Sequence, residues 1–145
     1  MTMSNAAPAS SPGPMAFLAR YGEIVYFVLR VVVGLLFVTH GAQKLFGVLH
    51  ATTQPAWSQA WIGGVIELVG GALVALGLFT RPAAFLVSGT MAVAYCQFHW
   101  KGAFDERFFP VINQGELALV YALLFLQIAC VGGGRFSLDA LRARR

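Results

Sequence analysis

Each of four long apolar segments in this sequence carries ionisable or amide side chains toward one end. A charged group at the centre of a bilayer costs at least about 2.5–3.5 kcal/mol, so such groups normally face other helices and find partners there. By distance from the nearer end of their segments, six of these residues lie in one half of the predicted helices. They are His40, Lys44, Glu67, His99, Asn113 and Glu116. Their types predict a small polar pocket, open outward, that binds a ligand or exchanges protons.

Helical spacing indicates where three of these side chains point. His40 and Lys44 are four residues apart, so they share one face of a helix. Glu67 lies on the glycine-rich face of its helix, and we therefore expect it to point toward the neighbouring helices. A structural interpretation stays open, in which Glu67 pairs with Lys44 or His40 only to fix helix register.

The other polar residues also allow structural interpretations. Asn113 and Glu116 have the N-x-x-E spacing of a capping box at a helix start. His99 fits an interfacial histidine without a ligand. Arg30 lies toward the opposite end of the first segment, and we expect it to hydrogen-bond Gln127 at a similar depth or to extend to the lipid headgroups.

Several other chemistries lack the residues they need. A di-iron site in a helix bundle uses a Glu-x-x-His pair on each of two helices, and the sequence has no such pair, so no metal site is expected. No phosphate loop or nucleophile motif is present, and no continuous polar path for a channel is evident. Cys96 and Cys130 fall near opposite faces and are expected to stay unpaired, because a disulfide needs Cα atoms within about 7 Å.

The composition is that of an integral membrane protein. Hydrophobic residues make up 58% of the chain, charged residues only 11%, and the mean hydropathy is +0.71. A soluble domain this small could not bury so much apolar surface. The formal net charge is +4, but the basic residues lie at the chain ends and helix flanks. The expected partner is therefore the lipid bilayer and not nucleic acid.

Four segments have the apolar character of membrane spans, which take about 20 helical residues. They cover residues 24–46, 57–79, 82–99 and 114–131. The sequence therefore predicts an all-α integral membrane bundle of four transmembrane helices. Residues 1–22 are expected to form a flexible tail, residues 23–134 the transmembrane domain and residues 135–145 a basic cytoplasmic tail, in which Ser137 caps a short helix.

The arginines indicate the orientation of these segments. Arg20, Arg81 and Arg135 lie on the same side of the membrane if there are four spans, and the basic C-terminal residues join them there. The positive-inside rule then places both termini in the cytoplasm.

Several stretches together resemble the DoxX family. They are RVVVGLLFVTHGAQKL from Arg30, ELVGGALVALGLFTRPAA from Glu67, a third helix ending in His99, NQGELALVY from Asn113 and GRFSLDAL from Gly134. The match in order and spacing covers about Arg30 to Leu141. The positions matching the family pattern are Arg30, His40, Lys44, Glu67, Arg81, His99, Asn113 and Glu116.

This resemblance implies a four-helix protein of the bacterial inner membrane. The family name comes from a relative of a subunit of a thiosulfate:quinone oxidoreductase. Other members are thought to work beside redox enzymes in oxidative-stress or thiol defence. The resemblance therefore implies the fold more strongly than it implies a reaction.

Three functions stay open at this point. The first is a membrane component of a redox or stress-defence system, without complete catalytic machinery of its own, that binds a quinone-like molecule or a redox partner protein. In it, Glu67 or Glu116 exchanges a proton with His40. The second is a non-redox binder or transporter of small molecules, for which four short helices would need to oligomerise. The third is a structural assembly factor whose polar network serves only helix register.

Overall fold

The computed structural model describes residues 15–144, and these residues form helices and connecting loops without any strand. Four longer helices make up most of the structure: α1 (Gly22–Phe46), α2 (Gln59–Leu76), α3 (Thr80–Ala94) and α5 (Glu116–Val131). Shorter elements are the 3-10 helix Ala16–Tyr21, the π-helix Tyr95–Trp100, the 3-10 helix Glu106–Phe108, α4 (Pro110–Asn113) and α6 (Leu138–Arg142).

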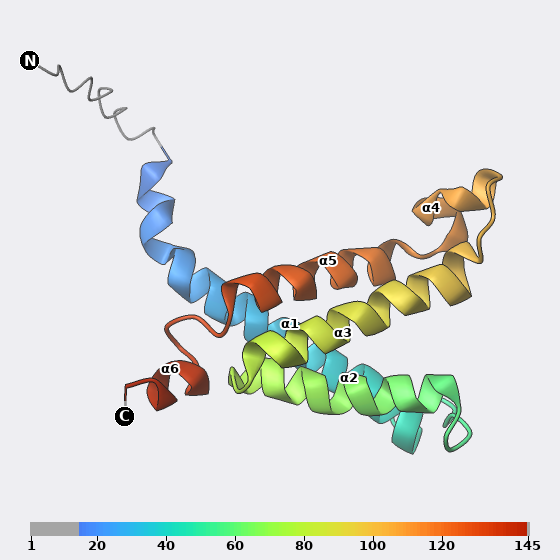
Figure 1. The fold of residues 1–145 in the computed structure, drawn as a ribbon, viewed down its shortest axis with the longest axis horizontal. Helices are drawn as coiled ribbons and strands as arrows, with labels where there is room; N and C mark the ends of the chain where they lie inside the picture. Colours follow the sequence, from blue (N-terminus) through green and yellow to red (C-terminus); the bar gives the residue numbers. More distant parts are fainter. Residues whose placement is uncertain (1–14, 145) are drawn as a thin grey trace, which may run out of the picture.

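The four longer helices pack side by side, α1 on α2, α2 on α3 and α3 on α5 (Figure 1). Phe37 brings α1 into contact with α5 as well, because its ring packs against those of Tyr121 and Phe125 on α5 at centroid distances of 4.9 and 4.5 Å. Fully buried Val74 and Val87 complete the core between the helices. The beginning of α1 and α6 lie toward one end of the molecule, here called the α6 end, and α4 lies at the opposite, α4 end.

The four apolar segments predicted from the sequence all become helices, with corrected boundaries. The second is shorter than the predicted 57–79 and covers Gln59–Leu76. A 3-10 helix precedes α1, so helical structure begins at Ala16, within the predicted tail; residues 1–14 of that tail lie outside the described residues. The third helix begins at Thr80 instead of Pro82 and continues through a π-helical turn to Trp100. The fourth begins only at Glu116, because Gln114 adopts a left-handed conformation at φ 59°.

Within the described part of the chain, two helical stretches are long and apolar enough to cross a membrane, Ala16–Phe46 and Gln59–Leu76. Glu116–Val131 is also apolar but shorter. The outward faces of the helices carry large apolar side chains that are more than half exposed, among them Leu35, Val69, Phe85 and Leu123. Such an apolar exterior is unfavourable in water and favourable in lipid.

Glycines let the backbones of α1 and α2 come into direct contact. A Cβ added to Gly34 would lie 2.6 Å from the carbonyl oxygen of Gly71, and one added to Gly41 would lie 2.6 Å from that of Gly64. Real Cβ atoms do not approach backbone this closely, so no other residue fits at these positions without moving a helix. Close approach through small residues is how helices associate where lipid removes the hydrophobic driving force.

We predict that Gly41→Ala destabilises the protein by about 1–3 kcal/mol, because the added methyl group overpacks the α1–α2 contact. Thermal unfolding in mild detergent, followed by circular dichroism, measures this. The matched control is Gly89→Ala on α3, where an added Cβ meets nothing within 4 Å. It should leave stability unchanged or raise it by up to about 1 kcal/mol through helix propensity. Equal melting temperatures for the two variants would contradict the packing account.

Candidate functional site

A buried ion pair joins α1 and α2 toward the α4 end. Lys44 Nζ lies 2.5 Å from Glu67 Oε1, and Glu67 is only 2% exposed, whereas the Lys44 side chain is 35% exposed. The second carboxylate oxygen, Glu67 Oε2, is also buried and has no hydrogen-bond partner among the described residues. Buried polar atoms are normally satisfied, so this oxygen is free to accept a hydrogen bond from a ligand or a water molecule.

A cavity of about 710 Å³ lies between α2 and α3 and reaches this ion pair. Its walls are largely apolar, with Ile66 and Phe98 among the lining side chains, and Lys44, Glu67 and His99 supply polar groups. The volume falls within the usual range for small-molecule sites, which are mostly apolar with a few polar groups.

The cavity differs from the predicted polar pocket in its lining and in where it opens. Ile62, Phe85 and Phe98 line it and are also about half exposed or more on the outer surface of the helices. It is therefore a groove between α2 and α3 whose rim is apolar.

A second cavity, of about 240 Å³, lies on the other side of the ion pair among α1, α3 and α5. His40, Gln114 and Tyr121 line it, together with Lys44, Glu67 and His99, which line the larger cavity as well. The ion pair therefore stands at the boundary between an apolar groove and a smaller, more polar chamber.

The structure brings four of the six predicted site residues together and separates two. His40, Lys44, Glu67 and His99 line the smaller cavity. Glu116 is exposed and lines neither cavity. Asn113 contacts the site only through its backbone carbonyl, which lies 3.2 Å from His99 Nδ1. Its side chain bonds to the Arg107 carbonyl instead.

The capping box predicted for Asn113 and Glu116 is wrong. The N-cap of α5 is Gly115, and no side chain caps the helix there. Asn113 Oδ1 instead accepts from the backbone N–H of Gly115 at 2.8 Å, and its Nδ2 donates to the carbonyl of Arg107 at 2.8 Å. Asn commonly forms such local bonds to backbone two residues ahead, and these compete with helix capping.

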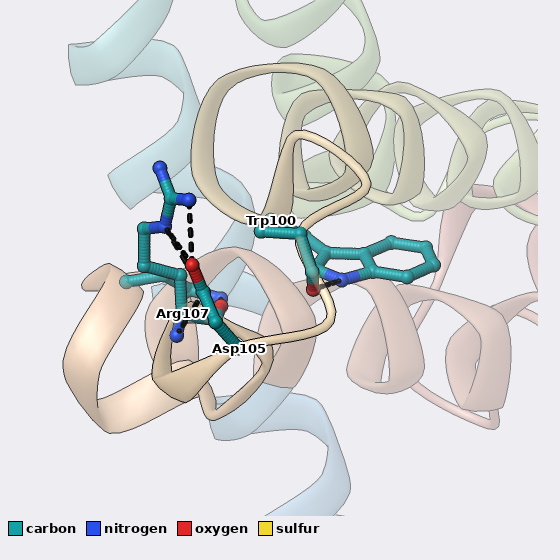
Figure 2. A network of polar contacts seen from close by, with 5 residues as sticks. Trp100, Asp105 and Arg107 are labelled. Atoms are coloured by element: carbon teal, nitrogen blue, oxygen red, sulfur yellow. Dashed lines mark hydrogen bonds and ion pairs between the residues drawn. The ribbon is translucent and has the colours of Figure 1, made fainter.

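The loop that follows His99 is held by its own polar contacts (Figure 2). Arg107 pairs with Asp105 at 2.6 Å, and the Trp100 indole N–H donates to the carbonyl of Ala103 at 2.7 Å. Hydrogen bonds from the Arg107 side chain and backbone lower the pKa of Asp105 to about 2. The contact that joins the two ends of the loop is the one between His99 Nδ1 and the Asn113 carbonyl, and it positions His99 at the smaller cavity.

Sequence reasoning missed the polar residues that complete the two cavities. Tyr121 and Gln114 line the smaller cavity, while Gln59 and Thr90 line the larger one. A tyrosine within the apolar run of α5 was a usable signal, because a buried Tyr hydroxyl usually needs a polar partner. Gln59 donates to the Gln97 amide across the groove mouth, a pairing that no sequence spacing indicates.

Arg30 belongs to the α6 end, and its predicted partner is wrong. The side chain is fully buried, so it does not extend to the headgroups, and Gln127 is exposed. Its guanidinium donates to the carbonyls of Val74, of Ala75 at 2.8 Å and of Phe136 at 2.7 Å. The last four carbonyls of any helix lack partners within the helix, and Arg30 satisfies two of those of α2, on Val74 and Ala75.

Two more charged side chains cap helices from a distance. Arg81 donates to the carbonyls of Ala129, Cys130 and Val131 at 2.6–3.2 Å and so caps the end of α5. Asp139 of α6 accepts from the Phe79 and Thr80 N–H groups at 2.9 Å and caps the start of α3. Arg135 is exposed, and its backbone N–H lies 3.4 Å from a Glu23 carboxylate oxygen.

At the α6 end, the pKa of the Asp139 carboxyl group is lowered by its surroundings. Burial acts to raise its pKa, but hydrogen bonds from Thr80 and Phe79 outweigh burial and hold the pKa below its usual value.

No group of three or more His, Cys, Asp or Glu residues within 15–144 is placed to hold a metal ion. Cys96 and Cys130 are both free.

The apolar helical architecture and the buried polar pair define a helical membrane protein. The DoxX family model matches residues 25–100, and the chain belongs to the DoxX family. An uncharacterized protein of Haemophilus influenzae is 42% identical, over 84% of this chain and 93% of the relative.

Two more distant relatives carry more descriptive names. One, from Bacillus subtilis, is named putative oxidoreductase CatD and is 30% identical over 81% of this chain and 86% of its own length. An uncharacterized membrane protein of Mycobacterium tuberculosis is 32% identical over 94% of this chain and 93% of its own length. No solved structure matches the chain significantly.

We predict that Asp139→Asn lowers the free energy of unfolding at neutral pH by about 1 kcal/mol, a typical value for a helix cap. Because the folded-state pKa lies below the usual value, this stabilisation is complete above about pH 4 and is lost as the pH falls through the folded-state pKa. Thermal unfolding of both proteins between pH 7 and pH 3 should therefore show the gap closing in acid. Glu106→Gln, in the exposed loop, is the control and should leave stability unchanged. A gap that stays constant with pH would contradict capping by the ionised carboxylate.

Proposed function

We propose that this protein is an accessory membrane component of a redox or stress-defence system and binds a quinone-like small molecule in the groove between α2 and α3. One observation carries the proposal. Glu67, almost fully buried, has one oxygen paired with Lys44 and the other without a partner among residues 15–144, on the wall of an apolar cavity of about 710 Å³. The name of the Bacillus subtilis relative, putative oxidoreductase CatD, supports a redox setting.

The groove has the chemistry that a quinone ring needs. The ring is flat and apolar, which suits side chains such as Ile66, Phe85 and Phe98. The quinone carbonyl oxygens accept hydrogen bonds, and the ammonium group of the partly exposed Lys44 side chain is a charged donor, which makes the stronger kind of hydrogen bond. The hydroxyls of the reduced form donate, and Glu67 Oε2 is the free acceptor within the same wall.

Reduction of a quinone takes two electrons and two protons. We propose that a redox partner protein supplies both electrons, and that Glu67 delivers the two protons one at a time, each taken from protonated His40 across the smaller cavity, which both residues line. The half-buried His40 then regains a proton from water after each transfer. Each quinone oxygen gains one proton, and the ring becomes the hydroquinone. Glu116, the other carboxylate considered from the sequence, is exposed and outside both cavities, so we give it no part in this transfer.

We further propose that α1, α2, α3 with its π-helical extension, and α5 all cross the bacterial plasma membrane, with both termini in the cytoplasm. Thr80–Ala94 and Tyr95–Trp100 together give a continuous helical stretch that reaches the α4 end. Arg20, Arg81 and Arg135 flank the α6 end, as the positive-inside rule requires of the cytoplasmic side. In this orientation Glu67 and the groove between α2 and α3 lie in the outer half of the bilayer, and the groove opens to lipid.

A purely structural role for the ion pair is the second candidate, and the α1–α2 glycine contacts favour it. Gly41 and Gly64 meet next to the pair, and Lys44 Cβ itself lies close to Gly64. The pair could then serve to fix the register of two helices that no hydrophobic force holds together. The two candidates differ in what Glu67→Gln does to a bound ligand.

We predict that the wild-type protein, purified in mild detergent and extracted with organic solvent, yields a quinone detectable by mass spectrometry. Glu67→Gln removes the charge and an acceptor, and it should reduce the quinone recovered per folded protein by about tenfold, as expected for one charge-assisted hydrogen bond. Glu116→Gln is the matched control, because it makes the same change on an exposed carboxylate outside the groove, and it should retain the quinone.

Stability must be measured alongside ligand content. If Glu67→Gln lowers the melting temperature while neither wild type nor variant carries a quinone or another defined small molecule, the structural role is supported and the binding proposal fails. Equal quinone content in all three proteins at equal folded yield would place the ligand away from Glu67.

A further inference from the structure

A third hollow, of about 450 Å³, lies at the α6 end and shares no residue with the two cavities at Glu67. Leu76 at the end of α2 forms one wall, and the segment that leads into and through α6 forms the other. The lining side chains there are Arg135, Phe136, Ser137, Leu138, Leu141 and Arg144. The hollow thus combines two guanidinium groups with a mainly apolar wall.

The segment that carries these residues is held firmly in place. Ser137 Oγ caps α6 by accepting from the Ala140 N–H at 3.1 Å. The Asp139 N–H donates to the Gly77 carbonyl at 2.8 Å, and its carboxylate caps α3. Arg30 binds the carbonyl of Phe136. These bonds hold the lining residues Phe136 and Ser137 directly and fix Asp139 beside Leu138, so the hollow is formed before any ligand arrives.

The arginine side chains of this hollow form no ion pair within residues 15–144, although the Glu23 carboxylate accepts a hydrogen bond from the backbone N–H of Arg135 at 3.4 Å. No carboxylate of the described residues lines the hollow itself. The nearby carboxylate of Asp139 is already engaged by Phe79 and Thr80. Arginine without a carboxylate partner is well suited to phosphate, which its planar guanidinium binds through two parallel hydrogen bonds.

The apolar part of the wall continues along the lipid-facing surface. Leu76 and Leu141 are 56% and 58% exposed. Leu76, Val69 and Ile62 are spaced seven residues apart on α2, so they form one exposed stripe that leads from the hollow toward the α4 end. From Leu76 to Val69 the helix rises about 10 Å, and one leaflet of the hydrocarbon core is about 15 Å deep.

We propose that this hollow binds one anionic phospholipid, with its phosphate between Arg135 and Arg144 and an acyl chain along Leu76 and Val69. The apolar wall favours a phospholipid over free phosphate, because an acyl chain is stabilised by contact with Leu76, Leu138 and Leu141, whereas inorganic phosphate gains nothing from them. The position also suits the cytoplasmic leaflet, where anionic lipids attract basic segments.

The test is a titration of the purified full-length protein with dioleoyl phosphatidylglycerol, followed by native mass spectrometry in mild detergent. Dioleoyl phosphatidylcholine and inorganic phosphate are titrated in parallel. The variant Arg135→Gln/Arg144→Gln is compared with the control Arg20→Gln/Lys101→Gln, which removes the same net charge outside the hollow. Because no hydrogen bond of the Arg135 or Arg144 side chain is found within residues 15–144, the variant should fold normally; its melting temperature without lipid checks this.

We expect one phosphatidylglycerol to bind the wild type at least about tenfold more tightly than phosphatidylcholine, since each arginine near a lipid surface contributes about 1 kcal/mol. The double variant should lose this preference, the control should keep it, and millimolar phosphate should not displace the lipid. Equal preference in the double variant, or equal binding of both lipids to the wild type, would overturn the proposal. Displacement by phosphate alone would overturn the assignment to a lipid.

Discussion

The backbone contact between α1 and α2 is the constraint on which the candidate site depends. Glycine at positions 34, 41, 64 and 71 lets the two helices approach so closely that an added Cβ would come within 3 Å of the facing helix. Because the helices lie so close together, Lys44 reaches Glu67 across the interface and pairs with it at 2.5 Å. A wider helix spacing would strand a carboxylate that is almost fully buried, which is strongly destabilising. The ion pair at the candidate site therefore depends on the close packing of α1 against α2.

The α6 end fixes α2 and α3 at their short connection and so shapes the groove between them. Arg30 binds the last carbonyls of α2, and Asp139 binds the first N–H groups of α3. Farther along, Gly70 lies against Val87, where an added Cβ would come within 2.5 Å of the valine side chain. Beyond this contact the residues of both helices line the groove that leads to Glu67 and His99. Held together at one end, the two helices enclose a cavity at the other.

The sequence predicted the features that depend on helical periodicity. Apolar length located four helices, and the glycine face of α2 correctly indicated that Glu67 points inward. Glu116 was predicted to join the site only because it lies at the same depth along its helix as the other polar residues. The direction in which a side chain points around the helix must also match, and for Glu116 it does not. The buried face of α5 carries Ala118, Ala122 and Phe125. Glu116 stands two residues before Ala118, about 200° around the helix, and so faces outward. The partners of Arg30, Arg81 and Asp139 were missed for another reason: they are backbone groups at helix ends, and no side-chain pattern in the sequence records them.

Photoaffinity labelling with an azido-quinone tests most directly whether the groove between α2 and α3 is the ligand site. The purified protein would be labelled with and without an excess of unlabelled short-chain quinone, and the modified peptides would be mapped by mass spectrometry. We expect labelling that the excess quinone suppresses, concentrated on groove-lining residues such as Ile66, Met91 and Phe98. Labelling spread over the exposed apolar surface of all helices, and unaffected by competitor, would contradict a ligand site at Glu67.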